Sequence, residues 1–134
     1  MSGEEFKRLL SPLKIGNITV RNRALSTAHG TGYAQGGRIG PRLIEYHRAR
    51  ARGGIGLIIF GTTSVDGSPI GIRGAAGGLV STDDSVVEQY RGLVDAIHAE
   101  GTKIFCLLSH SGSVTNMGPQ GEPPLAPSPI PMDR

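Results

Sequence analysis

Residues 41–60 read PRLIEYHRARARGGIGLIIF, and this stretch predicts an α-helix followed by a β-strand. Pro41 suits the first turn of a helix, and Gly53 and Gly54 end the helical pattern. The residues that recur at helical spacing are Leu43, Ile44, His47 and Ala51. Residues 57–60 are continuously apolar, which is typical of a strand buried on both faces of a parallel sheet. The stretch therefore indicates an α/β fold.

The segments before this stretch predict more strands. Residues 13–20 predict a small hairpin, in which apolar and polar residues alternate around the two-residue turn Gly16-Asn17. Residues 23–27 predict a short strand.

The segments after it continue the alternation. Residues 86–97 predict an amphipathic helix that begins with a capping box formed by Ser85 and Glu88. Residues 103–108 predict a third strand, and Cys106 within it is expected to pack inertly in the core. The order is a hairpin followed by β-α-β-α-β, which predicts a parallel sheet with right-handed crossovers.

Composition excludes several classes of protein. The chain has 134 residues, of which 37% are hydrophobic and 19% charged, as in a globular domain. One cysteine allows no internal disulfide, and no secretory signal or apolar run of about 20 residues is present, so we expect a cytoplasmic protein without a membrane partner. The net charge is +3 without a nucleic-acid motif, so we expect no nucleic-acid partner. Several arginines are close together in the sequence, which is a weak indication of anionic ligands. A solvent-exposed helix surface is the favoured interpretation of Arg42, Arg48, Arg50 and Arg52.

The long loops all follow strands. They cover residues 28–40, residues 61–82 and the chain from Ser109 onward, whereas the helix-to-strand connections are short. Parallel α/β folds bind ligands at the carboxyl ends of their strands, so we expect the functional site there. His29 and His110 lie just past two strand ends, where ligand contact and a structural hydrogen bond are equally open roles. The histidines and Cys106 lack metal-ligand spacing, so we expect no metal site.

Four segments carry a resemblance to a known family: residues 11–23, 45–59, 96–101 and 125–130. They resemble the amino-terminal part of the Old Yellow Enzyme-like, FMN-dependent NADH:flavin oxidoreductases. The likeness runs from about residue 10 to residue 131. Residues 26–34 look most like the branch of dienoyl-CoA reductases, trimethylamine dehydrogenase and N-methyl amino acid demethylases.

The resemblance implies a TIM barrel that holds FMN at the carboxyl ends of its strands. It places Thr27, Ala28 and His29 along the flavin and Thr62 close to the ring. Thr27 and Thr62 have an alternative role as ordinary strand-end residues with local hydrogen bonds. Gly30 stands where trimethylamine dehydrogenase has the cysteine that tethers its flavin, so the resemblance implies that FMN is bound non-covalently here.

Two residues depart from the family pattern. Leu107 stands where the family usually has a glutamine that bonds the flavin pyrimidine, and Ser113 stands where it often has an arginine. A lost hydrogen bond to a buried polar edge costs about 1–3 kcal/mol.

The resemblance implies hydride transfer through flavin N5. The reaction is either reduction of an activated alkene with NAD(P)H or oxidative demethylation of an N-methyl amine, on a small-molecule substrate. Catalytic residues are expected beyond the carboxyl-terminal end of this chain, and an iron–sulfur cluster and a second nucleotide only in a longer parent. The alternatives are a truncated non-catalytic α/β module that has lost the flavin site and a different TIM-barrel enzyme for a phosphorylated ligand.

Chain length sets the expected domain. A complete (β/α)8 barrel needs about 250 residues. Residues 1–134 are therefore expected to form a single incomplete barrel domain, with residues 118–134 as a Pro- and Gly-rich loop or tail. We expect the rest of a barrel or a homo-oligomer to complete it, and the isolated chain to be poorly stable and to bind FMN weakly.

Overall fold

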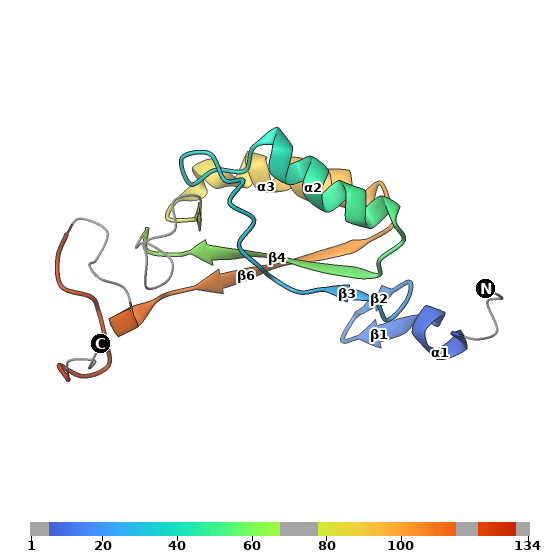
Figure 1. The fold of residues 1–134 in the computed structure, drawn as a ribbon, viewed down its shortest axis with the longest axis horizontal. Helices are drawn as coiled ribbons and strands as arrows, with labels where there is room; N and C mark the ends of the chain where they lie inside the picture. The colour runs from blue at the N-terminus through green and yellow to red at the C-terminus, as the bar shows by residue number, and fades with distance from the viewer. Residues whose placement is uncertain (1–5, 68–77, 115–120, 131–134) are drawn as a thin grey trace.

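The fold has two layers, a sheet and a pair of helices. The computed structural model describes residues 6–67, 78–114 and 121–130. Helices α2 (Pro41–Arg52) and α3 (Val87–His98) lie over one face of the sheet (Figure 1). The predicted helices are thus both present, and α2 begins at the predicted proline.

The sheet is parallel and has four strands: β3 (Leu25–Ser26), β4 (Leu57–Ser64), β5 (Leu79–Val80) and β6 (Lys103–Ser109). Strand β6 pairs along the length of β4, while β3 and β5 pair with the two ends of β4. Each connection from strand to parallel strand passes through a helix or a long loop. The predicted β-α-β-α-β order is confirmed, and β5 is an added strand inside the loop expected over residues 61–82. Residues 68–77 of that loop lie outside the described chain.

A separate hairpin precedes the sheet. Strands β1 (Leu13–Ile15) and β2 (Ile18–Val20) pair antiparallel, as predicted. Gly16 has a φ of +56°, a conformation that glycine adopts easily at the first central position of a tight turn. A short helix, α1 (Lys7–Leu10), comes before the hairpin and was not predicted. Both lie at the end of the molecule where β4 and β6 begin (Figure 1).

The core lies between the sheet and the two helices. From β4, Ile58 and Phe60 point into it and are 0% and 3% exposed. The residues that complete the cluster are Leu43, Ala51, Leu79, Leu93 and Ile97. Burial of these side chains provides the main stabilisation of the α/β layers.

The other face of the sheet is covered by no described element. Strand alternation and the pairing register place Leu25, Ile59, Phe105 and Leu107 on that face. Phe105 and Leu107 are 40% and 43% exposed. The third predicted strand is therefore present, and one of its faces is exposed in the described chain. Cys106 is likewise exposed rather than in the core, although partial burial raises the pKa of its thiol.

The start of α3 differs from the sequence prediction. The Asp83 carboxylate accepts the backbone N–H of Ser85 at 2.8 Å, and a single 3-10 turn, η1 (Asp84–Val86), leads into the helix. The Ser85 hydroxyl instead accepts a hydrogen bond from Arg38 at 2.6 Å. The predicted capping box is therefore wrong, because an aspartate two residues earlier provides the cap.

The carboxyl-terminal segment has little regular structure. A 3-10 turn, η2 (Gly112–Val114), follows β6, and residues 121–130 contain no helix or strand. This agrees with the predicted loop or tail as far as it is described. The remainder of residues 118–134 lies outside the described residues.

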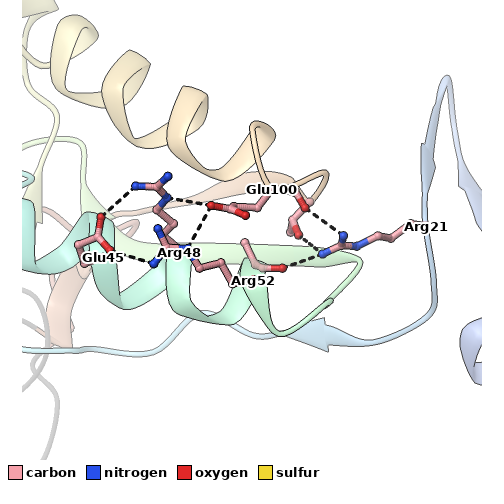
Figure 2. A network of polar contacts seen from close by, with 7 residues as sticks. Arg21, Glu45, Arg48, Arg52 and Glu100 are labelled. Carbon is pink, nitrogen blue, oxygen red and sulfur yellow. Dashed lines mark hydrogen bonds and ion pairs between the residues drawn. The ribbon is translucent and has the colours of Figure 1, made fainter.

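Arg21 connects the end of the hairpin to the two βα units (Figure 2). Its Nε donates to the Ile55 carbonyl at 3.1 Å, and its Nη1 donates to the Glu100 carbonyl at 3.0 Å. Its Nη2 donates to the Ala51 carbonyl at 2.7 Å and to Thr102 Oγ1 at 2.8 Å. The Ala51 carbonyl lies in the last turn of α2 and the Glu100 carbonyl just after α3, and such helix ends carry partial negative charge. One guanidinium therefore satisfies groups at the ends of both helices.

A second group of charges reinforces the same end of the molecule (Figure 2). Glu100 accepts hydrogen bonds from Arg48 at 2.9 Å and Arg52 at 3.2 Å, and Glu45 pairs with the same two arginines at 3.4 and 3.7 Å. The Arg48 hydrogen bond is the main reason why the pKa of Glu100 is lowered. These arginines are occupied by carboxylates of the chain itself, which agrees with their interpretation as helix surface.

Candidate functional site

The carboxyl ends of β4 and β6 meet at one edge of the sheet, because these strands are parallel, whereas β3 ends beside Ile58, near the start of β4. This edge lies away from the hairpin and the Arg21 contacts (Figure 1). The sequence-predicted residues Thr27 to His29 follow β3, while Thr62 and Leu107 lie in the carboxyl-terminal halves of β4 and β6. In folds of this type, ligands bind at this edge of the sheet.

Residues Thr27 to His29 directly follow β3 and belong to no helix or strand. Thr27 and His29 are exposed, and Ala28 is half-buried. The His29 Nδ1 lies 2.8 Å from the Thr27 carbonyl, and Nε2 is hydrogen-bonded to the Tyr46 hydroxyl on α2. The backbone N–H groups of Ala28 and His29 have no acceptor among the described residues. Two adjacent main-chain donors are therefore available at this strand end.

A β-bulge places Thr62 opposite Leu107. The register of β4 and β6 shifts between Phe60 and Thr63, so Gly61 and Thr62 together face one residue, Leu107. Gly61 has a φ of +117°, and a Cβ at that position would lie 2.8 Å from the Leu107 carbonyl oxygen. The Gly61–Thr62 peptide bond is cis. Only glycine fits this close approach of two backbones.

The structure thus brings together two of the predicted groups. Thr62 and Leu107 are neighbours across the bulge, and both are partly accessible. The Thr27 to His29 segment lies in the loop after the adjacent strand, and no described hydrogen bond joins it to Thr62. The side chain of Leu107 has no polar atom, so it offers an apolar surface and no hydrogen bond.

His110 forms a contact that the sequence analysis did not predict. Its Nε2 lies 3.1 Å from Asp66 Oδ2, and its Nδ1 accepts the backbone N–H of Gly112 at 3.1 Å. The Ser64 hydroxyl donates to Asp66 Oδ1 at 2.8 Å. The contact joins the loops that follow β4 and β6 at the candidate site. Of the two roles left open for His110, the structure shows the hydrogen-bonded one.

A series of aromatic rings leads from the candidate site into the core. His29 and Tyr46 meet edge to face at 5.7 Å between centroids, and Tyr46 meets His47 at 5.2 Å. His47 in turn lies 6.2 Å from Phe60. The Arg50 guanidinium lies 3.5 Å from the centroid of the Tyr46 ring, a cation–π contact.

His47 is a buried histidine without a full set of partners. It is 3% exposed, and its Nδ1 has no hydrogen-bond partner in the described chain. Burial, followed by the nearby charges of Arg50 and His29, lowers its pKa to about 4. His47 thus lies on the buried side of α2, together with Leu43 and Ala51 from the same helical spacing. The neutral ring packs as an aromatic core residue at neutral pH.

Within residues 6–67, 78–114 and 121–130, no group of three or more His, Cys, Asp or Glu side chains is placed to hold a metal ion. No helix in the described chain is long and apolar enough to cross a membrane.

The architecture defines the class of protein. Three parallel strands connected through helices and a long loop, with loops gathered at their carboxyl ends, form the amino-terminal part of a (β/α)8 barrel. A model of the NADH:flavin oxidoreductase / NADH oxidase family matches residues 8–133. The chain belongs to this family, which confirms the resemblance seen in its sequence.

Individual relatives agree with this assignment. The NADH oxidase of Thermoanaerobacter brockii is 41% identical over 128 residues, which are 94% of this chain and 19% of the relative. The N,N-dimethylglycine/sarcosine dehydrogenase of Chromohalobacter salexigens is 36% identical over 111 residues, which are 80% of this chain and 15% of the relative. The old yellow enzyme from Trypanosoma cruzi superposes with a TM-score of 0.73 at 30% identity, over 95% of this chain and 36% of that chain. The chain therefore spans less than a fifth of the length of the two curated relatives and about a third of the solved structure's chain.

Proposed function

We propose that this chain forms one side of the FMN site in an oxidoreductase that acts on a small-molecule substrate. The observation that carries the proposal is that the N–H groups of Ala28 and His29 have no acceptor among the described residues. They follow β3, and the next two strands of the sheet carry Thr62 and Leu107 in their carboxyl-terminal halves. Family membership supports the choice of cofactor.

The residues fit a flavin on two of its three requirements. A flavin ring needs hydrogen-bond donors near N5 and O4, apolar walls, and a polar or positive group near N1 and O2. Ala28 and His29 offer main-chain donors, and Leu107 offers an apolar surface. Leu107 provides no polar or positive group near N1 and O2, so another part of the protein would supply that group.

The residues of this chain would bind and orient the cofactor. FMN, when bound, supplies acceptance and donation of hydride at N5. Thr27, Ala28 and His29 would lie along one edge of the ring, and Thr62 would contact its face from the bulge. Gly30 offers no side chain for a covalent tether, so the cofactor is held by non-covalent contacts alone.

Two reactions follow from this site. In one, NAD(P)H is the electron donor and an activated alkene the acceptor. In the other, an N-methyl amine is the donor. The remaining barrel, or a second copy of the chain, would supply the catalytic side chains and cover the open face of the sheet. An iron–sulfur cluster and a second nucleotide belong to the proposal only for a longer parent, because the 134 residues contain one cysteine.

The test is anaerobic reduction of the full-length protein after loading with FMN. Loss of flavin absorbance with an N-methyl amino acid alone supports demethylation. Loss only with NAD(P)H, followed by recovery with an enone, supports alkene reduction. A protein that retains no FMN refutes the proposal and supports the alternative of a module without a flavin site, which the apolar Leu107 favours.

A further inference from the structure

Tyr46 on α2 holds the segment that follows β3. Strand β3 ends at Ser26, so the sheet does not fix the next three residues. The His29 side chain makes two hydrogen bonds there, one back to Thr27 and one across to the Tyr46 hydroxyl. The second bond is the one that attaches this segment to the helical layer.

The partners determine the direction of both bonds. The Thr27 carbonyl can only accept a hydrogen bond, so His29 Nδ1 carries the hydrogen. In the neutral ring Nε2 is then an acceptor, and the Tyr46 hydroxyl donates to it. Both ring nitrogens are therefore used within the chain. The His29 side chain is left without a nitrogen for a ligand, and its backbone N–H remains free.

Tyr46 is itself held firmly. Its neighbour His47 is buried in the core, which fixes this turn of α2. The Arg50 guanidinium lies over the Tyr46 ring, and its Nη1 donates to the Tyr46 carbonyl at 2.8 Å. The Tyr33 ring also packs edge to face against the Tyr46 ring, with 5.4 Å between the centroids. A hydroxyl fixed in this way is suited to orienting a mobile partner.

We propose that Tyr46 is a positioning residue of the flavin site. It fixes the His29 ring against α2, and this contact keeps the N–H groups of Ala28 and His29 turned away from the chain and available to the cofactor. The inference rests on the proposed function, since it assigns FMN to this edge. Tyr46 acts through His29 and does not touch the cofactor.

The test is a double-mutant cycle on FMN affinity in the full-length protein. Tyr46→Phe removes the hydroxyl, and His29→Ala removes its acceptor. Each single change is expected to raise the FMN dissociation constant about five- to tenfold, the effect of one lost hydrogen bond. In the His29→Ala background, Tyr46→Phe is expected to have less than about a twofold effect, because the bond is already absent. Tyr33→Phe is the matched control and is expected to change the constant less than about twofold.

Further readouts separate this role from a general loss of stability. The 15N chemical shift of His29 Nε2 in the FMN-free protein is expected to change in Tyr46→Phe and to stay the same in Tyr33→Phe. If Tyr46→Phe does not fold, His29→Ala decides the proposal alone, because His29 is exposed and its removal leaves the core intact. Equal losses from Tyr46→Phe in both backgrounds, or unchanged affinity in the single variants, would overturn the positioning role and leave FMN binding established. A wild-type protein that binds no FMN would instead overturn the proposed function, and this inference with it.

Discussion

Replacing Arg21 by methionine removes the guanidinium and keeps most of the apolar stem. Four hydrogen bonds are lost, two of them from the partly buried Nη2 to Ala51 and Thr102. Bonds from a charged donor to partly buried acceptors contribute about 1.5 kcal/mol each, and the two exposed bonds contribute about 0.5 kcal/mol or less. We therefore expect the free energy of unfolding to fall by about 3 to 4 kcal/mol, a large part of the 5–15 kcal/mol typical of a domain.

The assay is urea unfolding followed by circular dichroism. With a denaturant dependence of about 2 kcal/mol per molar urea, the midpoint is expected to fall by about 1.5 to 2 M. Arg23→Met is the matched control, because the Arg23 side chain makes one exposed hydrogen bond, to Ser11 at 3.2 Å. We expect the control to shift the midpoint by less than about 0.5 M. If Arg21→Met loses less than about 1 kcal/mol beyond the control, the reasoning that one side chain holds both helix ends is wrong.

Four other changes test further parts of the structure. Gly61→Ala is expected to destabilise the protein by more than about 2 kcal/mol and to weaken FMN binding, because of its positive φ and the close Leu107 carbonyl. At Gly92 on α3 a Cβ would meet nothing within 4 Å. Gly92→Ala is therefore expected to raise the free energy of unfolding by about 0.5–1 kcal/mol in the same urea unfolding assay. Leu107→Gln is expected to tighten FMN binding about five- to tenfold in a fluorescence titration, because the amide can bond the flavin pyrimidine. Weaker binding would contradict the position of Leu107 beside the flavin. Because the pKa of His47 is lowered to about 4, the unfolded chain binds its proton first, so stability is expected to fall from pH 6.5 towards 4. His47→Leu should flatten that decline, and an unchanged pH dependence would contradict it.

Local sequence patterns predicted the elements because those patterns act over short distances. Pro41 and the paired glycines after Arg52 mark the ends of α2, and the Gly16 turn specifies the hairpin. The alternation of strands and helices then indicates the parallel sheet and its ligand-binding edge. Family resemblance added the expected positions along that edge, such as Thr62.

The remaining features depend on contacts between distant residues, which no local pattern encodes. Arg21 looks like an ordinary residue after a strand, yet its partners lie 30 to 81 residues further along. The Tyr46 hydroxyl meets His29 only because α2 packs over the sheet. The exposed face of β6 could not be seen from its apolar run either, because a buried strand and an uncovered one have the same composition. The bulge at Gly61 had a weak signal, a glycine within a strand, which often marks such a site.

The contacts of Arg21 also bear on the order in which the chain assembles during synthesis. The hairpin emerges from the ribosome before the groups that accept the hydrogen bonds of Arg21. The last of these acceptors, Thr102, is made 81 residues after Arg21. Until then Arg21 lacks some of its acceptors, and the hairpin is held by the pairing of β1 with β2. Contacts of such long sequence separation form late and slow folding, because the intervening loop must close first. The hairpin is thus translated before the site on which it docks, and a nascent chain that ends before Thr102 lacks the contact that fixes the hairpin to the helical layer.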